Sequence, residues 1–315
     1  MNTQSIPGKC AHHLRRTAGV TGFYAKRFLG LKSVIKVHLD WNMGDEIMAL
    51  PLFPALKDKY PGSALFVHSR YPDLFLNNPY LDGINPQEDH FFDRLFDIRR
   101  DSKPVPRLQY WEALLGLTLK DKQPRLFFSE AERQAIRSAR TRLGSGPVLA
   151  ISAGASWHCK KWNPDYFRAL GNQLLKKFPN LRIFELGKNC PWMGLGENLI
   201  DRTGVREAAL RLAGCDLFLG NDSGLMHLAA AAGIPAIGLF GPVDPNPLVG
   251  SNARIYSMPA NVDCRGCWTS GTMKIPDTCP LGEPVCMDSI RPAEVFDKVL
   301  EILRLAPGSS WISNL

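Results

Sequence analysis

The stretch that most constrains this chain is residues 215–250, CDLFLGNDSGLMHLAAAAGIPAIGLFGPVDPNPLVG. Two short apolar runs of strand character, residues 216–219 and 236–240, flank small residues at 224–232 that are typical of a helix packed closely on a sheet. A strand, a helix and a second strand in this order form the unit from which parallel sheets are built. We therefore expect an α/β fold whose ligands bind at the carboxyl edge of its strands.

The turn that leads into this helix has the composition of an anion site. Residues 220–224, GNDSG, are small and polar. The first N–H groups of a helix have no partner within it, and the helix dipole adds partial positive charge, so a phosphate can bind there. His227 lies one turn further along the helix, where its ring can share the site. The structural alternative is a helix cap by Asp222 or Ser223 beside a buried histidine.

A second loop of the same half can reach the same anion. The apolar run 148–153 predicts a buried strand, and it leads into residues 154–162, GASWHCKKW, which include Ser156 and Lys160. Because both loops follow strands of one parallel sheet, they lie at the same edge. A diphosphate needs backbone N–H donors and one or two cations, and Lys160 is the predicted cation, with Lys161 as the alternative.

The composition indicates a globular protein with two domains. The chain has 315 residues, of which 45% are hydrophobic, and this is enough for two cores. No apolar run approaches the roughly 18 residues that span a bilayer, and no signal peptide is visible, so we expect a cytoplasmic protein. The Gly- and Pro-containing stretch 144–147 is the expected linker between an N-terminal domain, residues 33–143, and a C-terminal domain, residues 147–305.

The positive charge of the chain is concentrated near its start. The first 36 residues hold seven Lys and Arg and no acid, against a net charge of +8 for the whole chain. The body is therefore close to neutral, which argues against a nucleic-acid-binding face. Tyr24, Phe28 and Leu31 have helical spacing. Residues 1–32 are thus either a basic amphipathic helix on an anionic membrane surface or a solvated leader.

Two acidic residues follow the first predicted strand, residues 33–39. Asp45 stands at the mouth of the first strand-to-helix loop, where its position favours chemistry, although a helix N-cap is the alternative role. Glu46 is a rival for either role. The helical pattern that follows, residues 47–60, contains Pro51 and Pro54, which predict a kink or a late helix start.

Four of the eight cysteines cluster late in the chain, within residues 261–288. They are Cys264, Cys267, Cys279 and Cys286. Disulfides are rare in the cytosol, so the cluster indicates a metal site or free thiols. Four thiolates suit a tetrahedral zinc or a mononuclear iron with a structural role, because they leave no open position for catalysis. Four reduced thiols that pack a loop are the alternative.

These motifs together resemble the bacterial heptosyltransferases, glycosyltransferase family nine. The matching segments are residues 154–162 and 216–231, the turn 43–45, the stretch 239–242 and the cysteine spacing, and the match covers about residues 33–300. The resemblance implies a GT-B fold, in which two Rossmann-like domains face each other across a cleft. In that family the C-terminal domain holds a nucleotide-diphosphate sugar, usually ADP-heptose, and the N-terminal domain presents the acceptor.

The resemblance also implies residue roles. It makes Asp45 the general base for the acceptor hydroxyl and makes Lys160 the cation on the donor diphosphate. The residues implied to bind the phosphates and the sugar are Asp222, Ser223, Gly224 and His227. The resemblance further implies a reaction that inverts the configuration of the sugar carbon and needs no catalytic metal or cofactor. The carboxylate that the family places after the second strand of the donor domain has no match, because Glu185 falls within that strand.

Three functions are compatible with these features. The first is an inverting glycosyltransferase that transfers heptose from ADP-heptose to a lipopolysaccharide or other cell-surface glycan precursor, at the inner membrane where lipid-linked acceptors reside. The second is an autotransporter-type protein glycosyltransferase of the same fold, which the short N-terminal half favours and in which the cysteine loop supports oligomerisation. The third is a non-catalytic nucleotide-sugar-binding protein.

Overall fold

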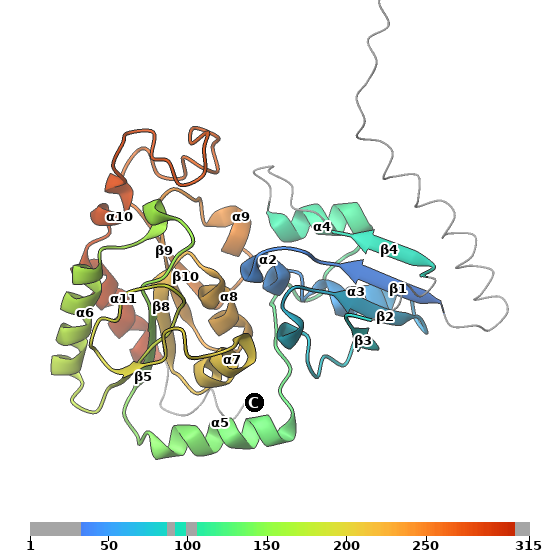
Figure 1. The fold of residues 1–315 in the computed structure, drawn as a ribbon, viewed down its shortest axis with the longest axis horizontal. Helices are drawn as coiled ribbons and strands as arrows, with labels where there is room; N and C mark the ends of the chain where they lie inside the picture. The colour runs from blue at the N-terminus through green and yellow to red at the C-terminus, as the bar shows by residue number, and fades with distance from the viewer. Residues whose placement is uncertain (1–32, 87–91, 99–105, 306–315) are drawn as a thin grey trace, which may run out of the picture.

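A computed structural model describes residues 33–86, 92–98 and 106–305 of the protein. The basic segment predicted at residues 1–32, with its membrane contact, lies outside these residues. The described chain forms two parallel sheets, one of four strands and one of six, each in its own half of the molecule (Figure 1). Within this part of the chain, no helix is both long and apolar enough to cross a bilayer.

The first sheet has the strand order β3-β2-β1-β4, and every neighbouring pair is parallel. Its strands are β1 (Val34–His38), β2 (Ala64–His68), β3 (Gly83–Ile84) and β4 (Arg94–Asp97). The connecting helices are α2 (Met43–Met48), α3 (Leu52–Lys59), the 3₁₀ turn η1 (Pro72–Leu74) and α4 (Arg107–Leu115). The chain reverses its winding direction between β1 and β4, and such a switch point is where open parallel sheets bind ligands.

The helical pattern predicted at residues 47–60 is divided into two helices. α2 ends at Met48, and α3 begins at Leu52 with Pro51 as its N-cap. A proline has no N–H to donate to the preceding turn, so the break falls where the sequence predicts an irregularity. The first helix nevertheless starts earlier than expected, and Asp45 therefore stands in the first turn of α2.

The second sheet has the order β10-β9-β8-β5-β6-β7 and is also fully parallel. Its strands are β5 (Val148–Ser152), β6 (Arg182–Glu185), β7 (Glu197–Asn198), β8 (Leu217–Asn221), β9 (Ala236–Phe240) and β10 (Ile255–Pro259). β5, β8 and β9 are buried at every residue, as expected for strands covered by helices on both faces. The switch point of this sheet lies between β5 and β8.

The helices of the second half follow the predicted alternation with strands. They are the 3₁₀ turn η2 (His158–Lys160), α6 (Pro164–Lys177), α7 (Val205–Ala213), α8 (Gly224–Ala231), α9 (Asn246–Val249), α10 (Val285–Ser289) and α11 (Pro292–Leu305). The unit β8-α8-β9 confirms the strand–helix–strand prediction. α8 can lie close to the sheet because Gly238 of β9 has no side chain, and a Cβ there would stand 2.2 Å from the Met226 sulfur.

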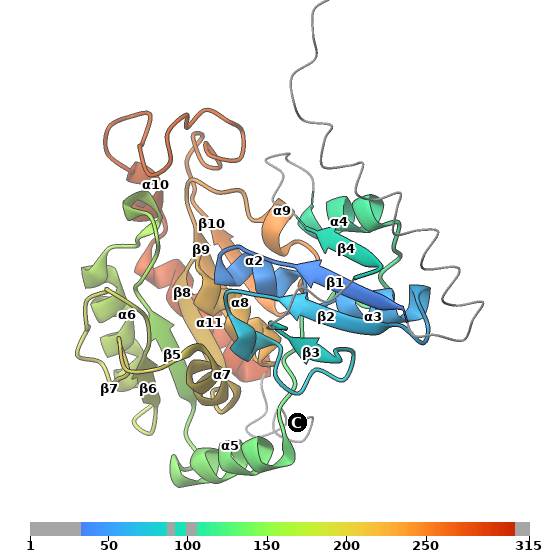
Figure 2. The ribbon, with the colours of Figure 1, turned by 45° about the vertical axis from the view of Figure 1, so that its right-hand side comes forward.

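A long connection joins the two sheets. It ends in α5 (Glu130–Arg142), whose N-cap Ser129 forms a capping box with Glu132. This connection contacts the second half before α5 begins, since the Leu126 N–H donates to the Ala231 carbonyl at 2.9 Å. α5 itself lies along α7 at the lower edge of the molecule (Figure 2). The domain boundary at residues 144–146 stays a prediction.

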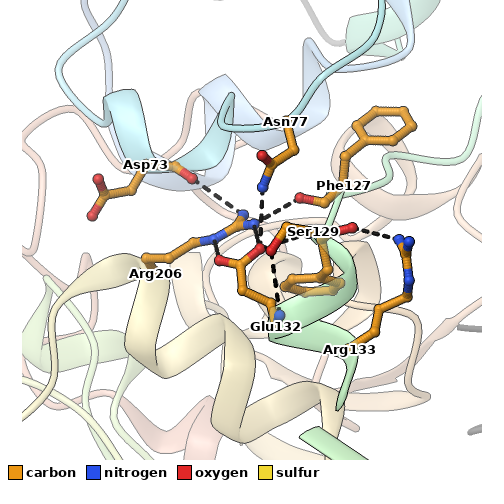
Figure 3. Close-up of polar contacts among 8 residues, drawn as sticks. Asp73, Asn77, Phe127, Ser129, Glu132, Arg133 and Arg206 are labelled. Carbon is orange, nitrogen blue, oxygen red and sulfur yellow. Dashed lines mark hydrogen bonds and ion pairs between the residues drawn. The ribbon is translucent and has the colours of Figure 1, made fainter. Parts of the chain in front are cut away.

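The two halves also meet at a polar cluster around Arg206 of α7 (Figure 3). The Arg206 guanidinium donates to both carboxylate oxygens of Glu132 at 2.8 and 2.7 Å and to the Phe127 carbonyl at 2.7 Å. From the first half, the Asn77 amide donates to Glu132 at 3.1 Å, and the Asp73 carbonyl accepts from Arg206 at 3.5 Å. We call this set of residues the latch. It ties α5, α7 and the segment that follows β2.

Candidate active site

The predicted donor residues gather at the switch point of the second sheet. η2 follows β5 and carries Lys160, while the turn after β8 carries Asp222. The Lys160 ammonium lies 2.6 Å from Asp222 Oδ2 and 4.7 Å from the centroid of the Trp157 ring. The two side chains of the pair are only 14% and 7% exposed. The ammonium predicted to meet a diphosphate is therefore held in place by an aspartate and an aromatic face.

Asn221 joins the two donor loops, a role that the sequence did not reveal. Its side chain is fully buried; the amide donates to the Ala153 carbonyl at 2.9 Å, and the amide oxygen accepts from the Trp162 N–H at 3.0 Å. The last residue of β8 thereby fixes both ends of the loop that carries Lys160. Ser156, the other predicted residue of this loop, is exposed and forms no hydrogen bond with the described residues.

The start of α8 is not capped by its own side chain. Ser223 is the N-cap residue, yet it makes no side-chain cap bond, and its Oγ is buried without a hydrogen-bond partner among the described residues. Buried hydroxyls in proteins are nearly always hydrogen-bonded, so an unpaired one at a helix start is a ready donor for a bound anion. The simple capping alternative for Ser223 therefore does not account for the geometry of this turn.

His227 sits where the two halves of the molecule touch. Only 4% of the residue is exposed, and burial lowers the pKa of its imidazole, with smaller and opposing effects from the neighbouring charges. These charges come from Asp222 and Lys160 on one side and from Asp45 and Arg107 on the other. The ring is therefore neutral at pH 7 and lies between the predicted donor residues and the predicted base.

Glycines allow the two helices at this contact to approach each other. A Cβ on Gly44 would lie 2.9 Å from His227 Cδ2, and a Cβ on Gly224 would lie 2.7 Å from the Met43 methyl group. Real Cβ atoms do not approach other atoms so closely, so both positions favour glycine. α2 and α8 lie side by side here (Figures 1 and 2). We call this contact, formed by residues 43–45 of α2 with Gly224 and His227 of α8, the seam.

Asp45 lies at the seam with one partner in its own half. The Arg107 guanidinium contacts Asp45 Oδ1 at 2.5 Å, and the two side chains are 13% and 11% exposed. Among the described residues, no hydrogen-bond donor reaches Oδ2. Asp45 follows β1 and Arg107 follows β4, so the pair marks the switch point of the first sheet.

Glu46, the rival carboxylate, has a different environment. It is fully buried, accepts from the backbone N–H groups of Trp41 and Arg70, and accepts from the Ser69 hydroxyl. Burial raises the pKa of Glu46, and these hydrogen bonds oppose that shift. Its carboxylate joins the loop after β1 to the loop after β2, so the structure assigns Glu46 to the support of the first half.

Glu185 also proves to be structural. It ends β6, is 2% exposed and accepts N–H bonds from Met193, Leu195 and Gly196 at 2.5, 2.7 and 3.2 Å. The carboxylate thus holds the loop that follows its strand and is not available to a donor sugar or base.

The four late cysteines share one cavity of about 250 Å³. Cys159 of η2 lines the same cavity, and all five thiols are free. Burial raises the pKa of Cys286 to about 11. In the part of the chain that the structure describes, no three His, Cys, Asp or Glu side chains are grouped as metal ligands. The predicted cluster is therefore present as a shared cavity, but the metal site is not supported by the side-chain arrangement.

Comparison with known proteins places these features in one family. The family model Glycosyltransferase family 9 (heptosyltransferase) matches residues 91–271. Two proteins called lipooligosaccharide heptosyltransferase 2 from Campylobacter jejuni subsp. jejuni are each 28% identical to this chain. The alignment with the serotype O:2 protein covers 50% of this chain and 51% of that protein. The alignment with the serotype O:6 protein covers 85% of this chain and 98% of that protein. Lipopolysaccharide heptosyltransferase 2 of Salmonella typhimurium is 27% identical, over 51% of this chain and 47% of that protein.

Solved structures show the same fold. A glycosyl transferase family 9 protein of Veillonella parvula has a TM-score of 0.66 at 15% identity, over 87% of this chain and 97% of that one. ADP-heptose lps heptosyltransferase II of E. coli has a TM-score of 0.63 at 16% sequence identity, over 87% of this chain and 99% of that one. The dodecameric iron-containing heptosyltransferase TibC of E. coli, in complex with ADP-D-beta-D-heptose, has a TM-score of 0.64 at 16% sequence identity, over 88% of this chain and 77% of that one. The α/β architecture with two parallel sheets is thus of the GT-B type that the sequence predicted, and the chain belongs to glycosyltransferase family 9, the heptosyltransferase family.

Proposed function

We propose that the protein transfers a heptose, with inversion, from ADP-heptose to a lipopolysaccharide precursor. The observation that carries this proposal is the seam, where Asp45 of the first half faces His227 and the Lys160–Asp222 pair of the second. Each group comes from the switch point of its own sheet. The relatives are named as heptosyltransferases, and one solved neighbour holds ADP-D-beta-D-heptose.

The geometry supports a direct displacement. The acceptor hydroxyl oxygen forms a bond to the anomeric carbon while the bond from that carbon to the diphosphate oxygen breaks. The hydroxyl proton passes to Asp45, and ADP leaves with the bonding electrons. Such a transition state carries positive charge on the sugar, and it needs a carboxylate base and positive charge on the leaving group. Lys160 and the start of α8, with the unpartnered Ser223 hydroxyl, are suited to the diphosphate.

The proposal assigns a role to each predicted donor residue. Lys160 leaves Asp222 to neutralise the diphosphate, Asp222 turns to the hydroxyls of the sugar, and Ser223 and Gly224 offer donors to the phosphates. The neutral His227 closes the site beside the base. Ser156 is exposed in the donor loop and pairs with none of the described residues, so its hydroxyl is available to the donor.

The test is transfer by the purified full chain. ADP-heptose is offered with a heptose-deficient lipopolysaccharide precursor, and ADP release and the mass of the acceptor are followed; we expect one heptose per acceptor with inverted configuration. A thermal-shift panel of nucleotide sugars tests the donor, because a ligand that binds only the native state raises its melting temperature. Stabilisation by other nucleotide sugars but not by ADP-heptose would refute the donor assignment.

A protein acceptor is the second candidate, which the four-stranded first sheet favours. Parallel incubations with candidate protein acceptors distinguish it from the lipid-linked acceptor. TibC is dodecameric, and this suggests that the present protein also forms an oligomer. Light scattering on the purified chain measures its oligomeric state. Binding of ADP-heptose without transfer to any acceptor would favour a non-catalytic nucleotide-sugar-binding protein.

We further propose that residues 1–32 contact a membrane and that the four late cysteines hold a structural metal. The basic composition of residues 1–32 supports contact with the anionic cytoplasmic face of the inner membrane. Co-sedimentation with anionic vesicles, and its absence with zwitterionic ones, tests this contact.

The cavity shared by Cys264, Cys267, Cys279 and Cys286 has the donor set for a structural zinc or iron, once the side chains draw together. Metal content measured before and after substitution of Cys267 by serine tests that site.

A further inference from the structure

The helix α4 supports the loop that carries Asp45 at two points. Its first residue, Arg107, contacts Asp45 Oδ1 at 2.5 Å. One turn later, the fully buried Trp111 stacks on Trp41 of the loop after β1, with ring centroids 5.5 Å apart and planes inclined by 23°. The position of the α2 start therefore depends on α4, which arrives from β4 on the other side of the switch point.

The ion pair leaves the two oxygens of Asp45 in different states. Oδ1 is engaged by Arg107, while no donor among the described residues reaches Oδ2. A general base acts only when a lone pair is held toward the proton that it removes, and a displacement of about 1 Å can cost about 10²-fold in rate. A carboxylate with one oxygen anchored and the other free meets this requirement.

The charges around the seam fix the partner of each carboxylate. Lys160 is engaged by Asp222 at 2.6 Å in the second half, and Arg107 is engaged by Asp45 in the first. His227, neutral through burial, lies between the pairs. Each half thus brings one nearly buried ion pair to the seam. Lys160, the cation of the donor half, is assigned to the diphosphate, whereas Arg107, the cation of the other half, has no assigned role in the transfer reaction.

We propose that Arg107 is the positioning residue for Asp45: it holds Oδ1 of the base so that Oδ2 faces the acceptor hydroxyl. The inference rests on the proposed transfer reaction and deepens it. Arg107 itself moves no proton. Its rigid, planar guanidinium directs an N–H group at Oδ1, which the freely rotating ammonium of a lysine does less well.

The test is a double-mutant cycle with Arg107→Gln, Asp45→Asn and the double variant. We expect Arg107→Gln to lower kcat about 10²-fold and to leave the KM for ADP-heptose within about threefold. If Arg107 acts through Asp45, then Arg107→Gln changes the residual rate of Asp45→Asn by less than about threefold, because coupled residues are non-additive. Arg107→Lys restores about tenfold of the lost rate, since charge returns without the planar geometry.

A matched control is Arg140→Gln. Arg140 contacts Asp216 at 3.2 Å, with side-chain exposures of 9% and 14%, at the start of β8 and far along the sheet from its carboxyl edge. We expect this variant to have a lower melting temperature and an unchanged kcat. It therefore distinguishes a loss of stability from a loss of positioning. Multiplicative losses in the cycle, or a raised donor KM with unchanged kcat, would overturn the role of Arg107 while leaving the transfer reaction intact. Absence of ADP release by the wild-type chain with every acceptor would instead refute the proposed function.

Discussion

The seam and the latch join the same two halves of the molecule in different ways. At the latch, every guanidinium nitrogen of Arg206 donates a hydrogen bond, and Glu132 Oε2 accepts from three donors (Figure 3). Among the described residues, one oxygen of Asp45 at the seam has no donor, and the hydroxyl of Ser223, next to Gly224 of the seam, is buried without a partner. The latch is saturated, whereas the seam retains unused hydrogen-bonding capacity.

The difference in hydrogen bonding indicates that the latch has a structural role and that the seam has a functional one. A saturated cluster gains nothing from a ligand, and it fixes the geometry of the groups that it joins. An unpaired buried group costs free energy in the absence of a ligand, and a bound ligand can pair it. Changes at the seam are therefore expected to alter the reaction, and changes at the latch are expected to alter stability.

The largest effect is expected from Asp45→Asn. The amide keeps the shape of the side chain but is not a base, so turnover falls by about 10³-fold or more while ADP-heptose binding is retained. ADP release and calorimetric titration with ADP measure the two quantities. Asp40→Asn is the control, since Asp40 is 63% exposed and pairs with Arg70 at 3.5 Å outside the seam. Retained turnover in Asp45→Asn would refute its assignment as the base.

Lys160→Ala should act on the donor. Loss of a charge-assisted hydrogen bond costs about 1.5–3 kcal/mol, which corresponds to about 10- to 100-fold weaker binding of ADP. Lys161→Ala is the comparison, because Lys161 is the next residue and is exposed. If titration gives the same affinity for Lys160→Ala as for the wild type, or if Lys161→Ala is the weaker binder, the cation has been misassigned.

Gly44→Ala should separate the two sides of the seam. Its new methyl group would meet the buried His227 ring at 2.9 Å, so α2 must move away from α8 and take Asp45 with it. We expect kcat to fall about tenfold with little change in melting temperature. Gly204→Ala serves as the control, because a Cβ at Gly204 meets no atom within 4 Å. An unchanged kcat in Gly44→Ala would mean that the contact is not kept during catalysis.

The smallest effect on activity is expected at the latch. Arg206 lowers the pKa of Glu132 from 4.5 to about 2. A lowered carboxyl pKa means that the stabilisation is complete above about pH 4.5 and is lost as the pH falls toward 2. Glu132→Gln should therefore cost about 1–3 kcal/mol of unfolding free energy at pH 7, less at pH 3, and leave kcat within about threefold.

The control for the latch lies on the same helix. Glu130 is exposed and pairs only with Arg133 and Arg137 of its own helix among the described residues, so Glu130→Gln should change stability little at either pH. Denaturant unfolding of both variants at the two pH values gives the comparison. A penalty for Glu132→Gln that grows as the pH falls would contradict the assignment of the latch.

Local signals in the sequence accounted for the elements and for the donor motif. The alternation of buried strands with helices predicted β5, β8 and β9, and the observed start of α5 is marked by a local signal of the same kind, the capping box of Ser129 and Glu132. These features depend on residues close in sequence, so they can be recognised without the fold. The two-residue strands β3 and β7 escaped prediction, because two residues have no periodicity.

Other features depended on partners distant in sequence. Asp45 and Glu46 are adjacent and chemically alike, and only the fold separates them: α2 turns Asp45 toward Arg107 and the seam, and it turns Glu46 toward the backbone of Trp41 and Arg70. The metal site that the cysteine spacing predicts stays a prediction: the fold brings the four late cysteines to one cavity, but spacing alone does not determine how a long loop closes around a metal.

The sequence by itself determined the family, the parallel α/β units and the helix start that suits a phosphate, because each is encoded in contiguous residues with a distinctive pattern. Only the tertiary structure decided that this helix start meets Gly44 and Asp45 of the other half, that Arg107 anchors the carboxylate, and that Asn221 fixes the Lys160 loop. The physical reason is that burial and pairing of charges are set by strands and helices that come from distant parts of the chain, and a linear pattern does not contain those distances.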